Sequence, residues 1–177
     1  MKRTSIQENT DMQSTARAFA LAAHGNQRYG EHPYAVHLDA VAELLVPFGE
    51  DAVTVGFLHD VVEDAAITLD EVRAEFGDAV ACCVALLTDE PGEDRKERKA
   101  KTYAKLAQVG PELELALTVK AADRLANVRA CIADGKADLL EVYRCEHSAF
   151  RGAAYRPGRC DRLWQELDTL LSVKVEP

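Results

Sequence analysis

The sequence lacks any apolar run long enough to cross a membrane. A spanning helix needs about 20 predominantly apolar residues, and each hydrophobic stretch here is interrupted sooner by charged or polar residues. The first residues, 1–10, are polar and contain no hydrophobic signal-peptide core. We therefore expect a cytoplasmic protein without a membrane partner.

Positive charge is also in short supply. The chain has 21 Lys and Arg residues against 30 Asp and Glu residues, which gives a formal net charge of -9. Binding to a nucleic-acid backbone requires clustered Lys and Arg, so this balance argues against a nucleic-acid partner. A small phosphorylated ligand stays compatible with it, provided that a local basic rim surrounds the binding site.

The five cysteines are odd in number and include no Cys-x-x-Cys pair. Both facts argue against a disulfide framework or a structural zinc site and favour reduced thiols. Cys82 and Cys83 lie within the apolar segment 79–87. We therefore expect them to pack in the core rather than to serve in redox chemistry.

No stretch shows the sustained alternation of apolar and polar residues that is typical of a strand, and no internal repeat is present. Apolar residues instead recur at helical spacing, between capping residues and Gly or Pro breakers. We predict an all-α fold in which a flexible N-terminus, 1–10, precedes a single domain, 11–177. The expected helices cover about 11–24, 36–46, 51–64, 68–76, 78–87, 95–108, 112–134, 138–151 and 159–171.

The expected helix 51–64 is apolar apart from a group of polar side chains near its end. At about 100° per residue, His59, Asp60, Glu63 and Asp64 occupy one arc of about 140°. They form two i,i+4 pairs, so their side chains can converge on one point. Burying such charges without partners costs several kcal/mol. Because a cation would offset that cost, the pattern predicts a cation site on a buried helix.

A second polar group lies on the expected helix 112–134, where Asp123 and Asn127 are i,i+4 neighbours. Alone, this pair means little, because an Asp beside an Arg is usually a solvated ion pair. A lone His37 at the start of a helix is likewise most often a capping or core residue. The order of the set changes this assessment: a His, then a His-Asp pair, then an Asp, each on a helix and separated by long intervals.

That order resembles the metal site of the HD phosphohydrolase superfamily. The narrower resemblance is to the hydrolase domain of RelA/SpoT-type alarmone enzymes and to the free-standing small alarmone hydrolases. It implies an HD-domain helical bundle. The matching motifs lie between about residues 15 and 130 and read His24-x-x-Gln-Arg28, Pro33-Tyr-x-x-His37, Leu58-His-Asp-x-x-Glu-Asp64, Phe76-Gly77 and Lys120-x-x-Asp-Arg-Leu-x-Asn127.

The resemblance implies a metal site with His37, His59, Asp60 and Asp123 as ligands. Two neutral imidazoles and two carboxylates form a mixed nitrogen and oxygen site, which suits Mn²⁺, Fe²⁺ or a similar divalent ion. We expect Mn²⁺ as the cofactor.

The resemblance also implies the remaining roles. Glu63 and Asp64 match the acidic pair of the alarmone hydrolases, and we expect them to be catalytic by orienting water and taking its proton. Arg28 and Asn127 match positions that contact the nucleotide, and we expect Lys120 to assist them. The loop that follows Arg28 looks shorter than in the family and reads Tyr29-Gly-Glu-His32.

The function that the resemblance implies is metal-dependent hydrolysis of the 3′-pyrophosphate of guanosine alarmones, ppGpp to GDP and pyrophosphate, in the stringent response. Because the chain ends at Pro177, we expect a lone hydrolase without synthetase or regulatory domains. Two alternatives stay open: an HD phosphohydrolase for another nucleotide, such as NADPH or a nucleoside triphosphate, and a helical binding module with an inactive site. The sequence predicts no particular oligomeric state.

Overall fold

The computed structural model describes the backbone of residues 5–172 and the side chains of residues 12–172. The predicted all-α fold is confirmed, since the only strands in that range are the two-residue β1 (Arg28–Tyr29) and β2 (His32–Pro33). The helices are α1 (Ser5–His24), α2 (Ala35–Leu45), η1 (Val46–Phe48), α3 (Glu50–Leu58), α4 (Val61–Asp64), α5 (Leu69–Phe76), α6 (Asp78–Leu87), α7 (Arg95–Ala107), η2 (Pro111–Leu113), α8 (Glu114–Ala133), α9 (Ala137–Ala154) and α10 (Asp161–Ser172).

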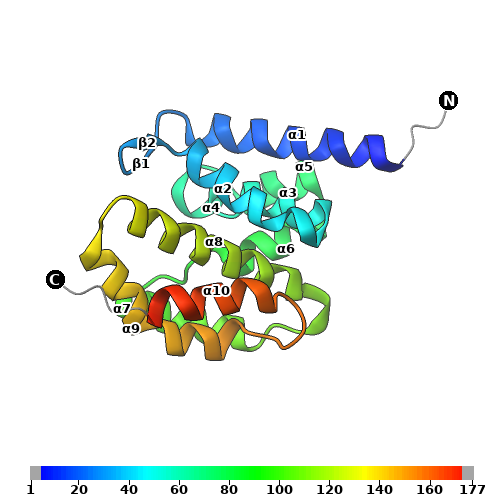
Figure 1. The fold of residues 1–177 in the computed structure, drawn as a ribbon. Helices are drawn as coiled ribbons and strands as arrows, with labels where there is room; N and C mark the ends of the chain where they lie inside the picture. The colour runs from blue at the N-terminus through cyan, green and yellow to red at the C-terminus, as the bar shows by residue number, and fades with distance from the viewer. Residues whose placement is uncertain (1–4, 173–177) are drawn as a thin grey trace.

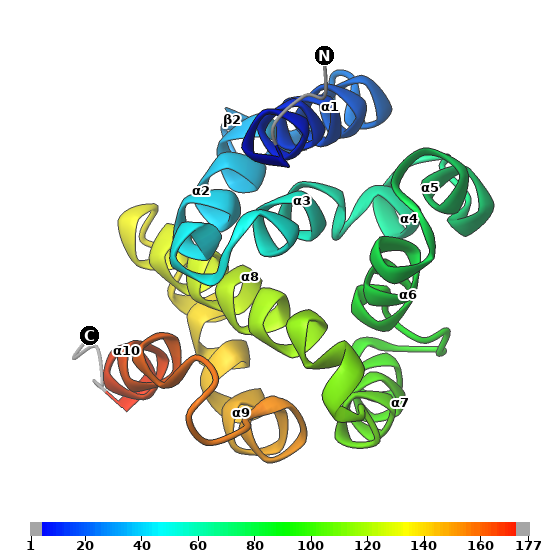
Figure 2. The ribbon, with the colours of Figure 1, turned by 90° about the vertical axis from the view of Figure 1, so that its right-hand side faces the viewer.

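Helix α8 lies at the centre of the bundle (Figure 1). It packs against α2, α3 and α6 on one side and against α9 and α10 on the other, as Figure 2 shows. A helix covered on all sides is expected to be apolar all round, and most buried residues of α8 are Ala, Leu, Val and Thr. Lys120, Asp123 and Arg124 are the charged exceptions. Buried charges need partners, so the surroundings of these three side chains are the place to look for a functional site.

The predicted single helix over 51–64 is wrong, because the chain turns at its first polar residues. Helix α3 ends at Leu58 and α4 begins at Val61. In a continuous α-helix the carbonyl of Gly56 would accept from the N–H of Asp60. Here the ring of His59 donates to that carbonyl at 2.7 Å, and Asp60 adopts φ -108° and ψ -2°. The ring of His59 thus takes the place of the Asp60 N–H as the hydrogen-bond donor to the Gly56 carbonyl.

The remaining helices agree with the prediction apart from some of their ends. Helix α1 begins at Ser5, before the expected start at residue 11. Residues 1–4 of the expected flexible N-terminus lie outside the described residues. Thr68 and Glu71 form a capping box at the start of α5. The N-cap of α6 is Gly77, at φ 85°.

Two other expectations concern the surface and the core. Within residues 5–172 no helix has the length and hydrophobicity needed to span a membrane. All five cysteines are described and free, and Cys83 is buried in the core while Cys82 is half-buried. The apolar core forms one continuous cluster that joins the helices on both sides of α8.

Candidate metal centre

The four predicted metal ligands come together from three parts of the chain. His37 lies on α2, His59 and Asp60 lie in the turn between α3 and α4, and Asp123 lies on α8. The two imidazole Nε2 atoms are 3.3 Å apart. Asp60 Oδ2 is 2.9 Å from His59 Nε2, and Asp123 Oδ1 is 3.4 Å from His37 Nε2 and 3.6 Å from His59 Nε2. His59 is fully buried, and His37 and Asp123 are almost so.

The close packing of α2 against α3 brings the two histidines together. A Cβ atom at Gly56 would lie 2.5 Å from Cδ1 of Leu45 on α2, and because Leu45 is fully buried, a larger residue here would force Leu45 and its surroundings to shift. Gly56 also supplies the carbonyl that orients the ring of His59. The same residue therefore sets both the separation of the helices and the direction of one imidazole.

The chemistry of these atoms fits a bound cation. The Gly56 carbonyl only accepts hydrogen bonds, so Nδ1 of His59 must carry a proton. In a neutral ring Nε2 then presents a lone pair toward the oxygens of Asp60 and Asp123, which are also electron-rich. Burial alone would lower the pKa of His59, but these carboxylates outweigh it and raise that pKa to about 10. The cluster thus requires positive charge at its centre, and a divalent ion would meet the requirement with the donor set that Mn²⁺ or Fe²⁺ accepts.

Lys120 is a buried cation beside this cluster. Its ammonium donates to the Leu87 carbonyl at 3.0 Å and lies 3.5 Å from Asp123 Oδ2. Burial lowers the pKa of Lys120, but the surrounding carboxylates, Asp123 and Asp60 foremost, raise it overall. Lys120 therefore acts as a fixed counter-charge within the site.

The predicted acidic pair lies at the rim rather than among the imidazoles, because the turn at His59 redirects α4. Both carboxylates are exposed. Glu63 Oε2 accepts from the backbone N–H of Asp89 at 2.8 Å. Asp64 Oδ2 lies 3.1 Å from the hydroxyl of Tyr34, which also donates to Asp60 Oδ2 at 2.5 Å. The prediction that His59, Asp60, Glu63 and Asp64 converge on one point from a single helix is therefore wrong.

Tyr34 is a site residue whose role was not predicted from the sequence. It is buried, and its hydroxyl joins the turn at Asp60 to the carboxylate of Asp64. Its ring also stacks on His24, with centroids 4.2 Å apart. A signal was present, because Tyr34 stands within the motif that contains His37, three residues before it.

The three expected nucleotide contacts lie in different surroundings. Arg28 is exposed on β1, and its guanidinium donates to the Glu31 carbonyl of the same hairpin. Lys120 is buried, as described above. Asn127 is half-buried, and its amide donates to Asp123 Oδ1 at 2.6 Å. Arg28 therefore faces solvent, whereas Lys120 and Asn127 both contact the carboxylate of Asp123.

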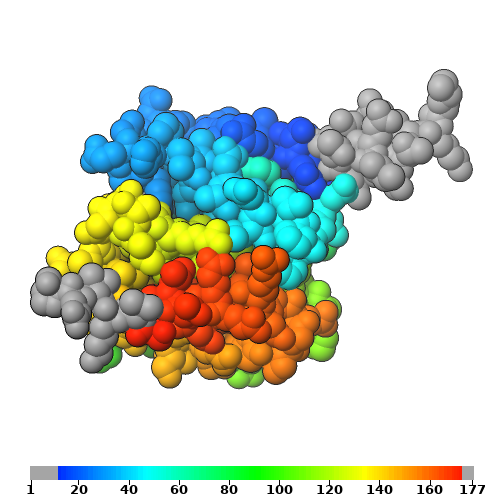
Figure 3. Space-filling model, viewed as in Figure 1, coloured from blue at the N-terminus to red at the C-terminus, as the bar shows by residue number. Residues whose placement is uncertain are grey.

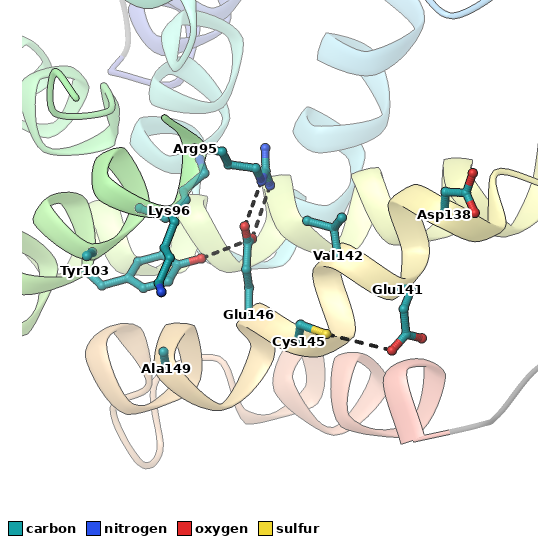
Figure 4. A pocket seen from close by; sticks show the side chains of 11 residues that line it. Arg95, Lys96, Tyr103, Asp138, Glu141, Val142, Cys145, Glu146 and Ala149 are labelled. Atoms are coloured by element: carbon teal, nitrogen blue, oxygen red, sulfur yellow. Dashed lines mark hydrogen bonds and ion pairs between the residues drawn. The ribbon is translucent and has the colours of Figure 1, made fainter. Parts of the chain in front are cut away.

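A cavity of about 610 Å³ opens between α7 and α9 (Figure 4). Arg95, Lys96 and Lys99 line one wall, and Glu146 lines the other together with Cys145. None of the four predicted metal ligands lines this cavity. Its basic wall was missed because the segment 95–101 has the pattern of an ordinary solvated helix.

This cavity is tied to the metal centre through the neighbour of Asp123. Arg124 is buried, with its guanidinium 3.1 Å from Glu146 Oε2 and 4.6 Å from the ring centroid of Tyr143. Arg95 binds the same carboxylate, with Nε 2.7 Å from Glu146 Oε1. Glu146 thus holds α7 and α8 together beside the proposed ligand Asp123.

A family model and several relatives match this chain. A family model described as an HD domain matches residues 16–150. A probable guanosine-3′,5′-bis(diphosphate) 3′-pyrophosphohydrolase from Synechocystis is 33% identical over 92% of this chain and 22% of its own length. The corresponding enzyme of Danio rerio, MESH1, is 33% identical over 63% of this chain and 64% of its own length. The chain thus spans under a quarter of the Synechocystis relative.

Solved structures show the same fold. A metazoan ortholog of SpoT that hydrolyzes ppGpp superimposes with a TM-score of 0.71 at 22% identity, and the match covers 96% of both chains. A protein of Listeria monocytogenes gives a TM-score of 0.63 at 24% identity over 79% of this chain and 98% of its own. Because the family model spans well over half of the sequence, and the motifs it contains converge in space, the chain belongs to the HD-domain family.

Proposed function

We propose that this protein is a metal-dependent hydrolase that removes the 3′-pyrophosphate of guanosine alarmones and converts ppGpp to GDP and pyrophosphate. The observation that carries the proposal is the buried cluster of His37, His59, Asp60 and Asp123, which needs a cation at its centre. Relatives named as 3′-pyrophosphohydrolases support it, one of them over 92% of this chain. The free cysteines support a reducing, cytoplasmic location.

The four ligands would hold one divalent ion, and Mn²⁺ suits their mixed nitrogen and oxygen donors. When bound, such an ion supplies Lewis-acid polarisation of a phosphoryl group and offsets the charge of an anionic substrate. Lys120 lowers the net negative charge that the substrate meets, since its ammonium is buried beside Asp123.

The acidic pair at the rim would act on water. Glu63 is oriented by the N–H of Asp89 and Asp64 by the hydroxyl of Tyr34, so both carboxylates are held beside the proposed metal ligands. Glu63 is exposed as a residue, but neighbouring groups remove part of the water around its carboxylate, and this and the nearby charge of Asp89 raise its pKa against the effect of that hydrogen bond. A carboxylate with a raised pKa is a better proton acceptor in general base catalysis.

The nucleotide end of the substrate would meet Arg28, which is exposed on the hairpin. Lys120 and Asn127 support the site from within, because both contact the carboxylate of Asp123. We expect Arg28→Ala to raise KM for ppGpp about tenfold and to change kcat less, since a contact made equally in the ground and transition states affects binding alone. Steady-state kinetics measure the two constants separately.

Arg129→Ala provides the matched control for that change. Arg129 lies on α8 and is also exposed. It forms an ion pair with α10, where Nη2 lies 2.7 Å from Glu166 Oε1. It should leave both kinetic constants unchanged. A fall in kcat as large as the rise in KM in Arg28→Ala would contradict a role for Arg28 in simple binding.

The position of bond cleavage tests the activity itself. With ppGpp and Mn²⁺, purified protein should release GDP and pyrophosphate in equal amounts, and ¹⁸O from labelled water should appear in the pyrophosphate. Chromatography with mass spectrometry identifies both products. Release of orthophosphate, or faster turnover of NADPH or a nucleoside triphosphate, would instead support an HD phosphohydrolase for another nucleotide.

A further inference from the structure

We infer that Tyr29, on β1, is a positioning residue of the proposed metal centre, because it holds His37 by ring stacking and Asp123 through Asn127. The inference rests on the metal site proposed above and assigns to it a residue from the hairpin. Tyr29 lies in the loop where the sequence departs from the pattern of the family it resembles.

The two histidines of the site are fixed in different ways. A histidine that binds a metal usually donates its second ring nitrogen to a neighbouring acceptor, which sets the orientation of the ring. His59 does so through the carbonyl of Gly56. The Nδ1 atom of His37 is buried, and it has no hydrogen-bond partner among the described residues. No hydrogen bond from a described residue to Nδ1 therefore sets the orientation of this ring, and contacts with the faces and edges of other rings can do so.

Two tyrosine rings enclose His37. The ring of Tyr29 is stacked on the imidazole, with centroids 4.6 Å apart and planes inclined by 17°. The ring of Tyr34 meets it edge-on, with centroids 5.6 Å apart and an angle of 70°. Aromatic contacts of this kind contribute about 0.5–1.5 kcal/mol beyond the burial of the rings. Tyr29 thus restrains the face of His37, and Tyr34 restrains its edge.

The hydroxyl of Tyr29 reaches a second ligand on another helix. It donates to Oδ1 of Asn127 at 2.6 Å, so the NH₂ group of that amide is free to donate elsewhere. The NH₂ group donates to Asp123 Oδ1 at 2.6 Å and to the backbone carbonyl of Asp123 at 3.0 Å. This Oδ1 is the same oxygen that lies near both imidazoles. Tyr29 therefore orients the carboxylate of Asp123 through one intermediate amide.

The hairpin presents Tyr29 at the junction of α2 and α8. Tyr29 pairs with His32 across the two strands, and Gly30 makes the turn at φ 58°. Gly30 lies beside the segment that follows α8, where a Cβ would meet Nζ of Lys136 at 2.6 Å. In Figure 3 this part of the chain, in blue, lies against the yellow end of α8. One side chain thus joins the hairpin to two helices that carry proposed ligands.

Metal affinity tests the inference directly. Mn²⁺ binding, followed by electron paramagnetic resonance of the free ion, gives a dissociation constant for the wild type and for each variant without any substrate. Tyr29→Phe keeps the stacked ring and loses the hydrogen bond to Asn127, so its affinity should fall about tenfold. Tyr29→Ala loses both and should bind about 100-fold more weakly, which is the range for loss of an outer-shell contact to a metal ligand.

A double-mutant cycle distinguishes positioning from a general loss of structure. If Tyr29 acts on Asp123 through Asn127, then adding Tyr29→Phe to Asn127→Ala should weaken Mn²⁺ binding by less than twofold more. Independent, fully additive losses would overturn this step. Tyr155→Phe, at the end of α9, removes a hydroxyl outside the site and should bind Mn²⁺ as the wild type does. If Tyr29→Ala does not fold, Tyr29→Phe still carries the test.

The outcomes separate this inference from the proposed function. If the wild type binds one Mn²⁺ that His59→Ala loses, and both Tyr29 variants bind as tightly as the wild type, then the metal centre stands and the role of Tyr29 is refuted. If the wild type binds no Mn²⁺, the proposed metal centre fails first and the role of Tyr29 fails with it. Weaker binding in both Tyr29 variants, with the ordered loss described above, supports the inference.

Discussion

Replacing His59 by alanine should abolish both metal binding and ppGpp hydrolysis. His59 is fully buried, its Nδ1 is fixed by the Gly56 carbonyl, and its Nε2 points at the other three ligands. Alanine would remove a ligand at the centre of the cluster. A water molecule in the cavity left behind could not supply a nitrogen donor with the same geometry. Asp60→Ala should have the same effect, since Asp60 Oδ2 lies 2.9 Å from that nitrogen. Elemental analysis and a hydrolysis assay measure the two losses.

The same variant should lose the stabilisation that metal gives to the folded state. A ligand that binds only the folded protein stabilises it by about 2.7 kcal/mol when its concentration is 100 times its dissociation constant. Added Mn²⁺ should therefore raise the Tm of the wild type and leave that of His59→Ala unchanged.

His147→Ala is the matched control for His59→Ala. His147 is a half-buried histidine on α9 whose Nε2 lies 2.7 Å from Asp168 Oδ1, so it also pairs with a carboxylate but stands outside the site. It should keep its metal and its activity. Full metal occupancy in His59→Ala would show that the ligand assignment is wrong.

The fold class was predictable from the sequence because it depends on local spacing, whereas the four proposed ligands were expected through the resemblance to HD phosphohydrolases. Helical periodicity needs only local pattern, and the interval from His37 to His59 to Asp123 is visible without knowledge of the packing. The break after Leu58 was not predictable from periodicity, because it involves the ring of His59 and the carbonyl of Gly56. A pattern of apolar residues indicates which face of a helix is buried. It does not indicate which backbone group a polar side chain will hydrogen-bond.

The roles of Tyr29 and of the cavity beside Arg95 depend on contacts between distant segments. Tyr29 and Asn127 are 98 positions apart, and Arg95 and Glu146 are 51 apart. In the sequence, a tyrosine in a loop and an arginine at the start of a charged helix both read as surface residues. The contact between Asn127 and Asp123 was predictable from their i,i+4 spacing. The hydrogen bond from Tyr29 to Asn127 was not, because the two residues are far apart in the sequence.

Removing the charge of the acidic pair should slow turnover while metal stays bound. Glu63 and Asp64 lie at the rim on α4, where their carboxylates contact the N–H of Asp89 and the hydroxyl of Tyr34 rather than an imidazole. Glu63→Gln and Asp64→Asn keep the size of each side chain and remove its capacity to take a proton. A general acid or base contributes about 10²- to 10⁴-fold to rate, so kcat should fall within that range.

The two variants also separate the contributions of the pair. Asp64→Asn retains an oxygen that can accept from the hydroxyl of Tyr34, and Glu63→Gln retains one for the N–H of Asp89, so the surrounding structure and the Mn²⁺ content should match the wild type. Glu75→Gln, an exposed position on α5, is the control for charge alone and should change kcat less than twofold. If both rim variants kept kcat within a fewfold of the wild type, proton transfer would have to be assigned to a different group. If only one lost activity, that carboxylate would be the base, and its partner would serve to hold water in place.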